Sequence, residues 1–191
     1  MTRRRIEAKL EVSTDKSQWH PTPLAAPLVL VTSRSSRGDP HVARKSWITM
    51  VSVAPPTLLL SCRLSHRTAI NILETREFVV NVPGEDVAER AWRTVELPGE
   101  DGADGRWSYV DSVRVTPPRV QECRAHLECV LESTRRVADE DVVFFARIVS
   151  VSLDESLLSG TPAERYKALR ALLYLEADLL GVVDAARRAP P

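Results

Sequence analysis

The sequence predicts a mainly β domain of the α+β class with peripheral helices. Two observations support this class: short runs of apolar and β-branched residues recur along the chain, and turn-forming residues bound most of them. No internal repeat and no linker divides the 191 residues into two cores. We therefore expect one domain over residues 24–191, after an N-terminal arm over 1–23. A closed barrel is expected, because closure removes exposed strand edges.

Six segments have the pattern of buried or half-buried strands. The first, Leu28-Val-Leu-Val31, is a continuous apolar run, and residues 35–40 after it have the composition of a turn. Residues 1–20 lack a clean period, so they remain either a frayed arm or a short first strand. In chain order, the six expected strands are 28–33, 46–53, 57–62, 78–82, 125–132 and 142–151.

Helices are expected between and after these strands. Ser65 is placed to cap a short helix, because its hydroxyl can accept a hydrogen bond from an unpaired helix N–H. Residues 85–93 are also expected to be helical. Near the C-terminus, Thr161-Pro-Ala-Glu164 has the pattern of a capping box with proline at the first helical position. Apolar residues at helical spacing predict that this helix continues through Leu173 toward Leu180.

Composition narrows the functional classes. Lysine plus arginine number 26 and aspartate plus glutamate number 26, which argues against a nucleic-acid-binding surface. No apolar run is long enough to cross a bilayer, and no signal peptide is visible. Three cysteines without a Cys-x-x-Cys pair and four scattered histidines suggest neither a disulfide framework nor a metal site. We expect a cytoplasmic protein that binds no metal, nucleic acid or membrane.

Residues 41–82 concentrate cations and hydroxyl groups. His41, Arg44 and Lys45 precede Ser46 and Trp47, while residues 61–68 place further hydroxyls and two arginines at an expected helix start. Helix N-termini and arginine side chains both suit a phosphate. The alternative is a solvated loop followed by an ordinary helix cap. For Trp47 the alternative to a ligand contact is a place in the core.

The segments Leu28–Thr32, Ser46–Pro56 and Arg67–Pro83 resemble, in their order and spacing, the flavin reductase-like family. The similarity is to the flavoredoxin branch of the FMN-binding split barrels, and it extends over about residues 24–153, with Gln121–Cys129 resembling a second-half strand of the family. The resemblance implies a six-stranded antiparallel split β-barrel. It also implies a homodimer with FMN bound near the dimer interface.

The resemblance implies a set of site residues but assigns no catalytic residue. Trp47 matches a flavin-site tryptophan and Thr68 a phosphate-side threonine, and Arg106 stands where some relatives have a lysine. The other residues implied to line the flavin are Ser46, Thr49, Ser61 and Arg67, with His41 in place of an asparagine. A family histidine is replaced by Asp141-Val-Val143, and residues 177–181 lack an aromatic that often covers the flavin.

The implied function is an FMN-binding oxidoreductase, either an NAD(P)H-dependent flavin reductase or a flavoredoxin-like electron carrier. Its implied partners are flavin, a reduced nicotinamide and a monooxygenase that uses the reduced flavin. Because the sequence departs from the family at His41 and near residue 177, an alternative is a split barrel that has lost flavin turnover. Such a protein would bind another small ligand in a biosynthetic pathway. A purely structural or interaction barrel is a third alternative.

Overall fold

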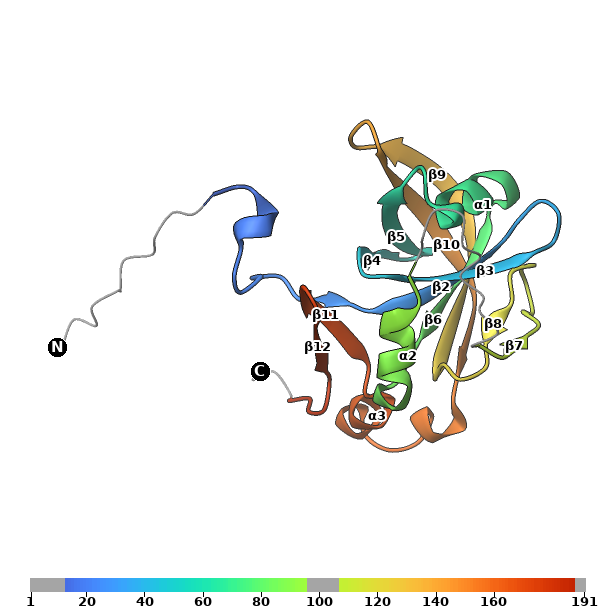
Figure 1. Ribbon diagram of the computed structural model, residues 1–191. Helices are drawn as coiled ribbons and strands as arrows, with labels where there is room; N and C mark the ends of the chain where they lie inside the picture. The colour runs from blue at the N-terminus through green and yellow to red at the C-terminus, as the bar shows by residue number, and fades with distance from the viewer. Residues whose placement is uncertain (1–12, 96–106, 188–191) are drawn as a thin grey trace.

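A seven-stranded antiparallel sheet forms the body of the protein (Figure 1). The computed structural model describes residues 13–95 and 107–187. All six predicted strands are confirmed, and β3 joins them, although its polar sequence did not predict a strand. The spatial order is β3 (Pro40–Lys45), β2 (Val29–Arg34), β6 (Glu77–Val82), β9 (Ala125–Arg136), β10 (Asp141–Leu153), β5 (Pro56–Arg63) and β4 (Ile48–Val53).

The sheet curls into a barrel that stays open between β3 and β4. These strands stand at opposite ends of the hydrogen-bonded order, yet only Ser46 and Trp47 separate them in the chain. The sheet must therefore bend until its two edges are close. The expected closed barrel is wrong, because β3 and β4 do not pair with each other in the sheet. Instead, the backbone N–H of Arg44 donates to the carbonyl of Thr94 at 2.9 Å, which covers the edge of β3.

Two hydrophobic clusters pack on opposite faces of β2. Val29 and Val31 belong to the first cluster, while Leu28 and Leu30 belong to the second. Because side chains alternate between the faces of a strand, a strand buried on both faces appears in the sequence as one continuous apolar run. The first cluster also holds Leu60, Ile72, Phe78 and Phe144, and the second holds Val42, Trp107, Val120 and Leu172.

Helix α1 (Arg67–Thr75) packs on β2, β3 and β5. It buries Ala69 and Ile72 and ends at Arg76, whose backbone is left-handed with φ 63°. The predicted cap at Ser65 is wrong: His66 occupies the cap position and makes no side-chain capping bond there. The predicted helix over 85–93 is confirmed as a 3₁₀ turn, Glu85–Val87, followed by α2 (Ala88–Arg93).

The C-terminal segment differs from its predicted helical course. The capping box is confirmed, since Thr161 and Glu164 exchange both of its hydrogen bonds at the start of α3 (Pro162–Leu169). The helix then ends at Arg170. Leu173 and Leu180 lie in two strands, β11 (Leu172–Glu176) and β12 (Leu179–Val182), which with β1 (Ala26–Pro27) form a three-stranded sheet. No residue of α3 is buried, so no apolar face favours a longer helix.

Two short strands and two short 3₁₀ turns complete the described structure. β7 (Tyr109–Val110) pairs with β8 (Arg119–Val120), and the 3₁₀ turns are Lys16–Gln18 and Glu155–Leu157. Burial raises the pKa of the Tyr109 hydroxyl to about 12. His126 on β9 is half-buried between Ser152 Oγ at 3.0 Å and the Val120 carbonyl at 2.8 Å. Burial lowers its pKa, and these contacts make it a structural residue.

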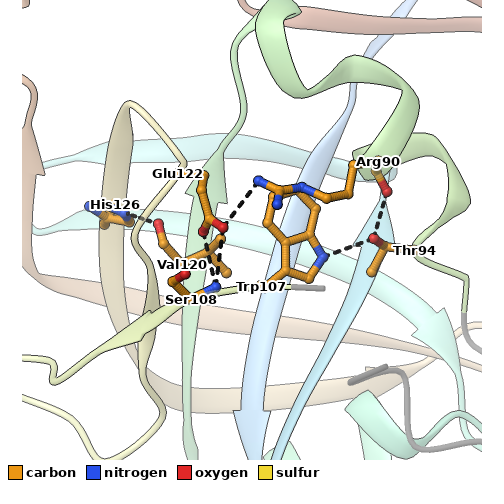
Figure 2. A network of polar contacts seen from close by, with 7 residues as sticks. All are labelled: Arg90, Thr94, Trp107, Ser108, Val120, Glu122 and His126. Carbon is orange, nitrogen blue, oxygen red and sulfur yellow. Dashed lines mark hydrogen bonds and ion pairs between the residues drawn. The ribbon is translucent and has the colours of Figure 1, made fainter. Parts of the chain in front are cut away.

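A polar network holds α2 against the segment that follows residue 106 (Figure 2). The guanidinium of Arg90 pairs with Glu122 at 3.1 Å and lies 3.9 Å from the centre of the Trp107 ring. The indole N–H of Trp107 donates to Thr94 Oγ1 at 3.0 Å, and the Thr94 hydroxyl donates to the carbonyl of Arg90. The network therefore fixes α2, which carries Trp92, and the residues just after it, including Val95.

Candidate functional site

A pocket of about 510 Å³ opens at the split of the barrel. Its walls come from the end of β3, the Ser46–Trp47 bridge, the end of β5, α2, and both the N-terminal and C-terminal segments of the described chain. This volume is within the range of small-molecule sites, about 300–1,000 Å³. The lining residues include Lys16, Leu28, Arg44, Lys45, Ser46, Trp47, Ser61, Cys62, Arg63, His66, Trp92, Val95, Asp141, Tyr174 and Ala177.

Cations and hydroxyls gather where β5 leads into α1. Lys45 is buried, and its Nζ lies 3.2 Å from Nδ1 of His66. Arg63 lies at the exposed rim of the pocket, 3.9 Å from Glu140. The N–H of Ser61 donates to the carbonyl of Trp47 at 2.9 Å, which joins the bridge between β3 and β4 to β5. Among the described lining residues, these positive groups and nearby hydroxyls suit a phosphate group.

The part of the pocket nearest α2 and β11 is aromatic. The rings of Trp92 and Tyr174 stack with centroids 6.2 Å apart and an interplanar angle of 14°. The Arg44 guanidinium lies 3.7 Å from the centre of the Trp92 ring, and its Nη1 donates to the Trp92 carbonyl. Burial lowers the pKa of Arg44. Leu28 adds an apolar wall, so this region suits a planar ligand and would shield that ligand from water.

Three of the implied flavin-site residues share this pocket: Ser46, Trp47 and Ser61. Trp47 has 54% of its surface exposed, so its alternative place in the protein core is wrong. An exposed indole at a pocket rim can cover a ligand or a partner surface. The split of the barrel explains the grouping, because Ser46 and Trp47 form the short bridge between β3 and β4 while Ser61 is near the end of β5.

The remaining implied residues lie elsewhere. His41 and Arg67 line a second pocket of about 500 Å³ between the β2–β3 turn and α1, together with Asn71. Thr68 is fully buried in the first turn of α1, and Thr49 is exposed on β4. Arg106 lies outside the described residues. The structure therefore brings together the bridge and the β5 residues, but it does not gather all eight around one pocket.

The aromatic wall of Trp92 and Tyr174 was not predicted from the sequence. Tyr174 supplies an aromatic ring from β11, three residues before the segment that lacks the family's covering aromatic. Trp92 and Lys16 also line the pocket but come from distant parts of the chain. The pattern of Leu172-Leu-Tyr-Leu175 could have suggested a strand, but no local signal pairs Trp92 with Tyr174.

The described residues contain neither a metal-binding cluster nor a membrane-spanning helix. No group of three or more His, Cys, Asp and Glu side chains among them could hold a metal ion. Within residues 13–95 and 107–187, no helix is long and apolar enough to span a membrane. Cys62, Cys123 and Cys129 are buried and form no disulfide among the described residues. Burial raises the pKa of the Cys129 thiol, which agrees with its interpretation as a small apolar residue.

The open antiparallel barrel, with a cationic and aromatic pocket at its split, defines a split-barrel protein with a site suited to a planar phosphate-bearing ligand. Residues 22–179 match the family described as "Flavin reductase like domain". The chain belongs to this flavin reductase-like family, and family membership supports a flavin-related oxidoreductase function.

Three solved structures illustrate the similarity of fold. Flavoredoxin from Methanosarcina acetivorans is 21% identical, with a TM-score of 0.81 and 95% of each chain covered. Nitrilotriacetate monooxygenase component B from Bacillus cereus is 20% identical, with a TM-score of 0.82, covering 95% of this chain and 100% of the other. An FMN-binding protein from Thermus thermophilus is 19% identical, with a TM-score of 0.79, covering 96% and 100%. These similarities confirm the split-barrel fold, although the main sheet has seven strands instead of six.

Proposed function

We propose that this protein is an NAD(P)H-dependent flavin oxidoreductase, a flavin reductase or flavoredoxin-like electron carrier, that binds FMN in the pocket at the split of the barrel. One observation carries the proposal: a single pocket combines buried and rim cations with a stacked aromatic wall. FMN has the matching parts, a charged phosphate and a planar ring system. Family membership supports the same choice of cofactor.

The donor set of the pocket fits FMN. Lys45, Arg63 and His66 would bind the phosphate, because charge-assisted hydrogen bonds to an anion are the strongest that these side chains make. The hydroxyls of Ser46 and Ser61 add neutral donors. Leu28 and the Trp92–Tyr174 pair would keep water from the ring. When bound, FMN supplies the capacity to accept a hydride, and the protein supplies binding and orientation.

Titration of the purified protein with FMN and with riboflavin tests the proposal. We expect quenching of flavin fluorescence at a 1:1 ratio, tighter binding of FMN than of riboflavin, and oxidation of NADPH or NADH when flavin is present. Riboflavin lacks the phosphate, so the difference in affinity measures the contribution of the cationic residues. A protein that leaves flavin fluorescence unchanged and oxidises neither nicotinamide would refute the proposal.

Replacing Trp47 with alanine is expected to weaken FMN binding about tenfold, by loss of aromatic contact area. Because Trp47 is 54% exposed, the free energy of unfolding should change by less than about 1 kcal/mol. Fluorescence titration and urea unfolding measure the two effects. Trp19→Ala is a matched control, since Trp19 does not line the pocket. Equal FMN affinity in the wild type and Trp47→Ala would contradict the placement of the flavin.

We further propose that a second copy of the chain covers β4, giving the homodimer that the family resemblance implies. Strand β4 pairs only with β5 among the described strands, so its other edge is open. Four apolar side chains on β4 or just before it each have 46% or more of their surface exposed: Trp47, Met50, Val51 and Val53. An open edge with exposed apolar residues is a surface that other chains can cover.

Val51→Glu is expected to convert the dimer to a 21.3 kDa monomer, because it places a charge in an apolar interface. Light scattering after size-exclusion chromatography measures the mass. Val137→Glu, at a position 67% exposed on the β9–β10 hairpin, should leave the dimer intact. A wild-type protein that elutes as a monomer, or a Val51→Glu variant that stays dimeric, would exclude this interface.

We also propose that the reduced flavin serves a partner monooxygenase in the cytoplasm. The structural similarity to nitrilotriacetate monooxygenase component B supports the partner, and three buried cysteines without a disulfide among the described residues are compatible with a reducing compartment.

The second candidate is a split barrel that binds a small ligand without flavin turnover. Two observations favour it: Thr68 is buried and Thr49 lies on an exposed strand face, so neither of these implied flavin contacts lines the pocket. FMN binding accompanied by nicotinamide oxidation would exclude this alternative.

A further inference from the structure

Arg44 and Lys45 are neighbours on β3 but serve different sides of the pocket. Side chains alternate between the faces of a strand, so consecutive residues point in opposite directions. Lys45 contacts His66 beside α1, whereas Arg44 contacts Trp92 of α2. One phosphate bound by Lys45 and His66 therefore does not account for the guanidinium of Arg44.

The environment of Arg44 is unusual for a half-buried cation. Its backbone N–H donates to Thr94, and its Nη1 donates to the Trp92 carbonyl. Across residues 13–95 and 107–187, no acidic side chain forms an ion pair with it. Burial disfavours the charged form and lowers the pKa of the group. An anion bound in the pocket would reverse this penalty.

The orientation of Arg44 limits the shape of that anion. With Nη1 engaged, Nε and Nη2 remain, and this pair of parallel N–H groups matches the two oxygens of a carboxylate. The guanidinium carbon lies 3.7 Å from the centre of the Trp92 ring, within the range of a cation–π contact. A carboxylate bound side-on lies in the guanidinium plane, and so does an aromatic ring conjugated with that carboxylate. Such a ligand can pack against the Trp92 and Tyr174 rings that lie beside Arg44.

We propose that Arg44, with the part of the Trp92–Tyr174 wall beside it, forms a second subsite, which binds a planar aromatic carboxylate next to the flavin ring that the rest of this wall covers. The proposal rests on the proposed function, because it places this ligand beside FMN in the same pocket. The ligand would be a second substrate, a benzoate-like compound held by a bidentate contact to Arg44 and by packing against the rings of Trp92 and Tyr174.

Calorimetric titration of FMN-loaded protein with benzoate and with uncharged benzamide tests the subsite. We expect benzoate to bind about tenfold more tightly than benzamide, the usual advantage of a charge-assisted contact. Arg44→Gln should remove this preference. Arg44→Lys keeps the charge and the fold but lacks the planar fork, so it should also lose most of the preference. Arg93→Gln is the matched control, because Arg93 lies beside Trp92 in α2 but is paired with Glu89 outside the pocket.

The outcomes separate this inference from the proposed function. If FMN does not bind the wild type, the proposed function fails, and titration of the flavin-free protein with benzoate still tests Arg44. If FMN binds but benzoate and benzamide bind equally, or if benzoate displaces FMN, the second subsite is wrong. A rise in the KM for NADPH in Arg44→Gln, with benzoate binding unchanged, would assign Arg44 to the reductant and overturn the proposal.

Discussion

Replacing Lys45 with methionine and Arg63 with glutamine is expected to weaken FMN binding about 100-fold, while the affinity for riboflavin changes by less than about twofold. Each hydrogen bond from a charged group to the phosphate contributes about 1.5–3 kcal/mol, and a factor of 10 in affinity corresponds to about 1.4 kcal/mol. Two such contacts therefore account for the expected loss. Methionine preserves most of the volume of the Lys45 side chain, which is 8% exposed.

The ratio of FMN to riboflavin affinity is the measurement that checks this result, since both ligands present the same ring. Each single variant should lower the ratio about tenfold. Arg136→Gln, which removes an exposed arginine from the β9–β10 hairpin outside the pocket, is the charge-matched control and should leave the ratio unchanged. A double variant in which FMN and riboflavin lose affinity equally would show that these cations act on the ring or on the fold instead of on the phosphate.

Asn81→Leu is expected to lower the free energy of unfolding by about 3 kcal/mol. The Asn81 side chain is fully buried on β6 and ties three segments together. Its Oδ1 accepts from the N–H of Val120 at 2.8 Å, and its Nδ2 donates to the carbonyl of Leu30 at 3.1 Å and to Thr32 Oγ1 at 3.2 Å. Leucine is similar in size, but it leaves these buried groups without their partner, at about 1–3 kcal/mol for each group left unsatisfied.

Urea unfolding followed by circular dichroism measures the loss, with Asn71→Leu as the comparison. Asn71 is equally buried, but within the described part of the chain its side chain donates to a single partner, Ser33 Oγ at 3.0 Å, so its replacement should destabilise the protein by a smaller amount. The slope of free energy against urea should stay constant in both variants if the fold is retained. A change below about 1 kcal/mol in Asn81→Leu would mean that water or neighbouring groups replace the lost bonds.

The strands of the core could be predicted because their sequence patterns follow directly from burial. Residues 28–31 form a continuous apolar run since β2 packs a cluster on each face. By contrast, β3 carries His41, Arg44 and Lys45, and it is recognisable as a strand only through its pairing with β2 and its pocket contacts. The C-terminal apolar spacing is compatible with either a helix or strands, and pairing with Ala26 and Pro27 decides for strands.

The candidate site was predictable where one local segment builds it. Ser46 and Trp47 lie together in the bridge between two edge strands, and Ser61 is held beside them by a backbone bond. The aromatic wall was not predictable, because Trp92 and Tyr174 approach each other only after α2 and β11 have packed on the second hydrophobic cluster. For Thr68, the position on α1 could be predicted from the sequence, but the burial of its side chain could not, because that burial follows from the packing of the helix.

The pocket is lined by residues from both flanks of the barrel, so it can hold a ligand only when both flanks are in place. Lys16 and Leu28 come from the N-terminal flank, and Tyr174 and Ala177 come from the β11 region, which pairs with β1. Because Tyr174 and Ala177 line the pocket, the site is complete only when the β11–β12 hairpin has docked. A bound ligand would therefore stabilise the docked hairpin by mass action. Occupancy of the pocket and protection of β11 from proteolysis should therefore rise together.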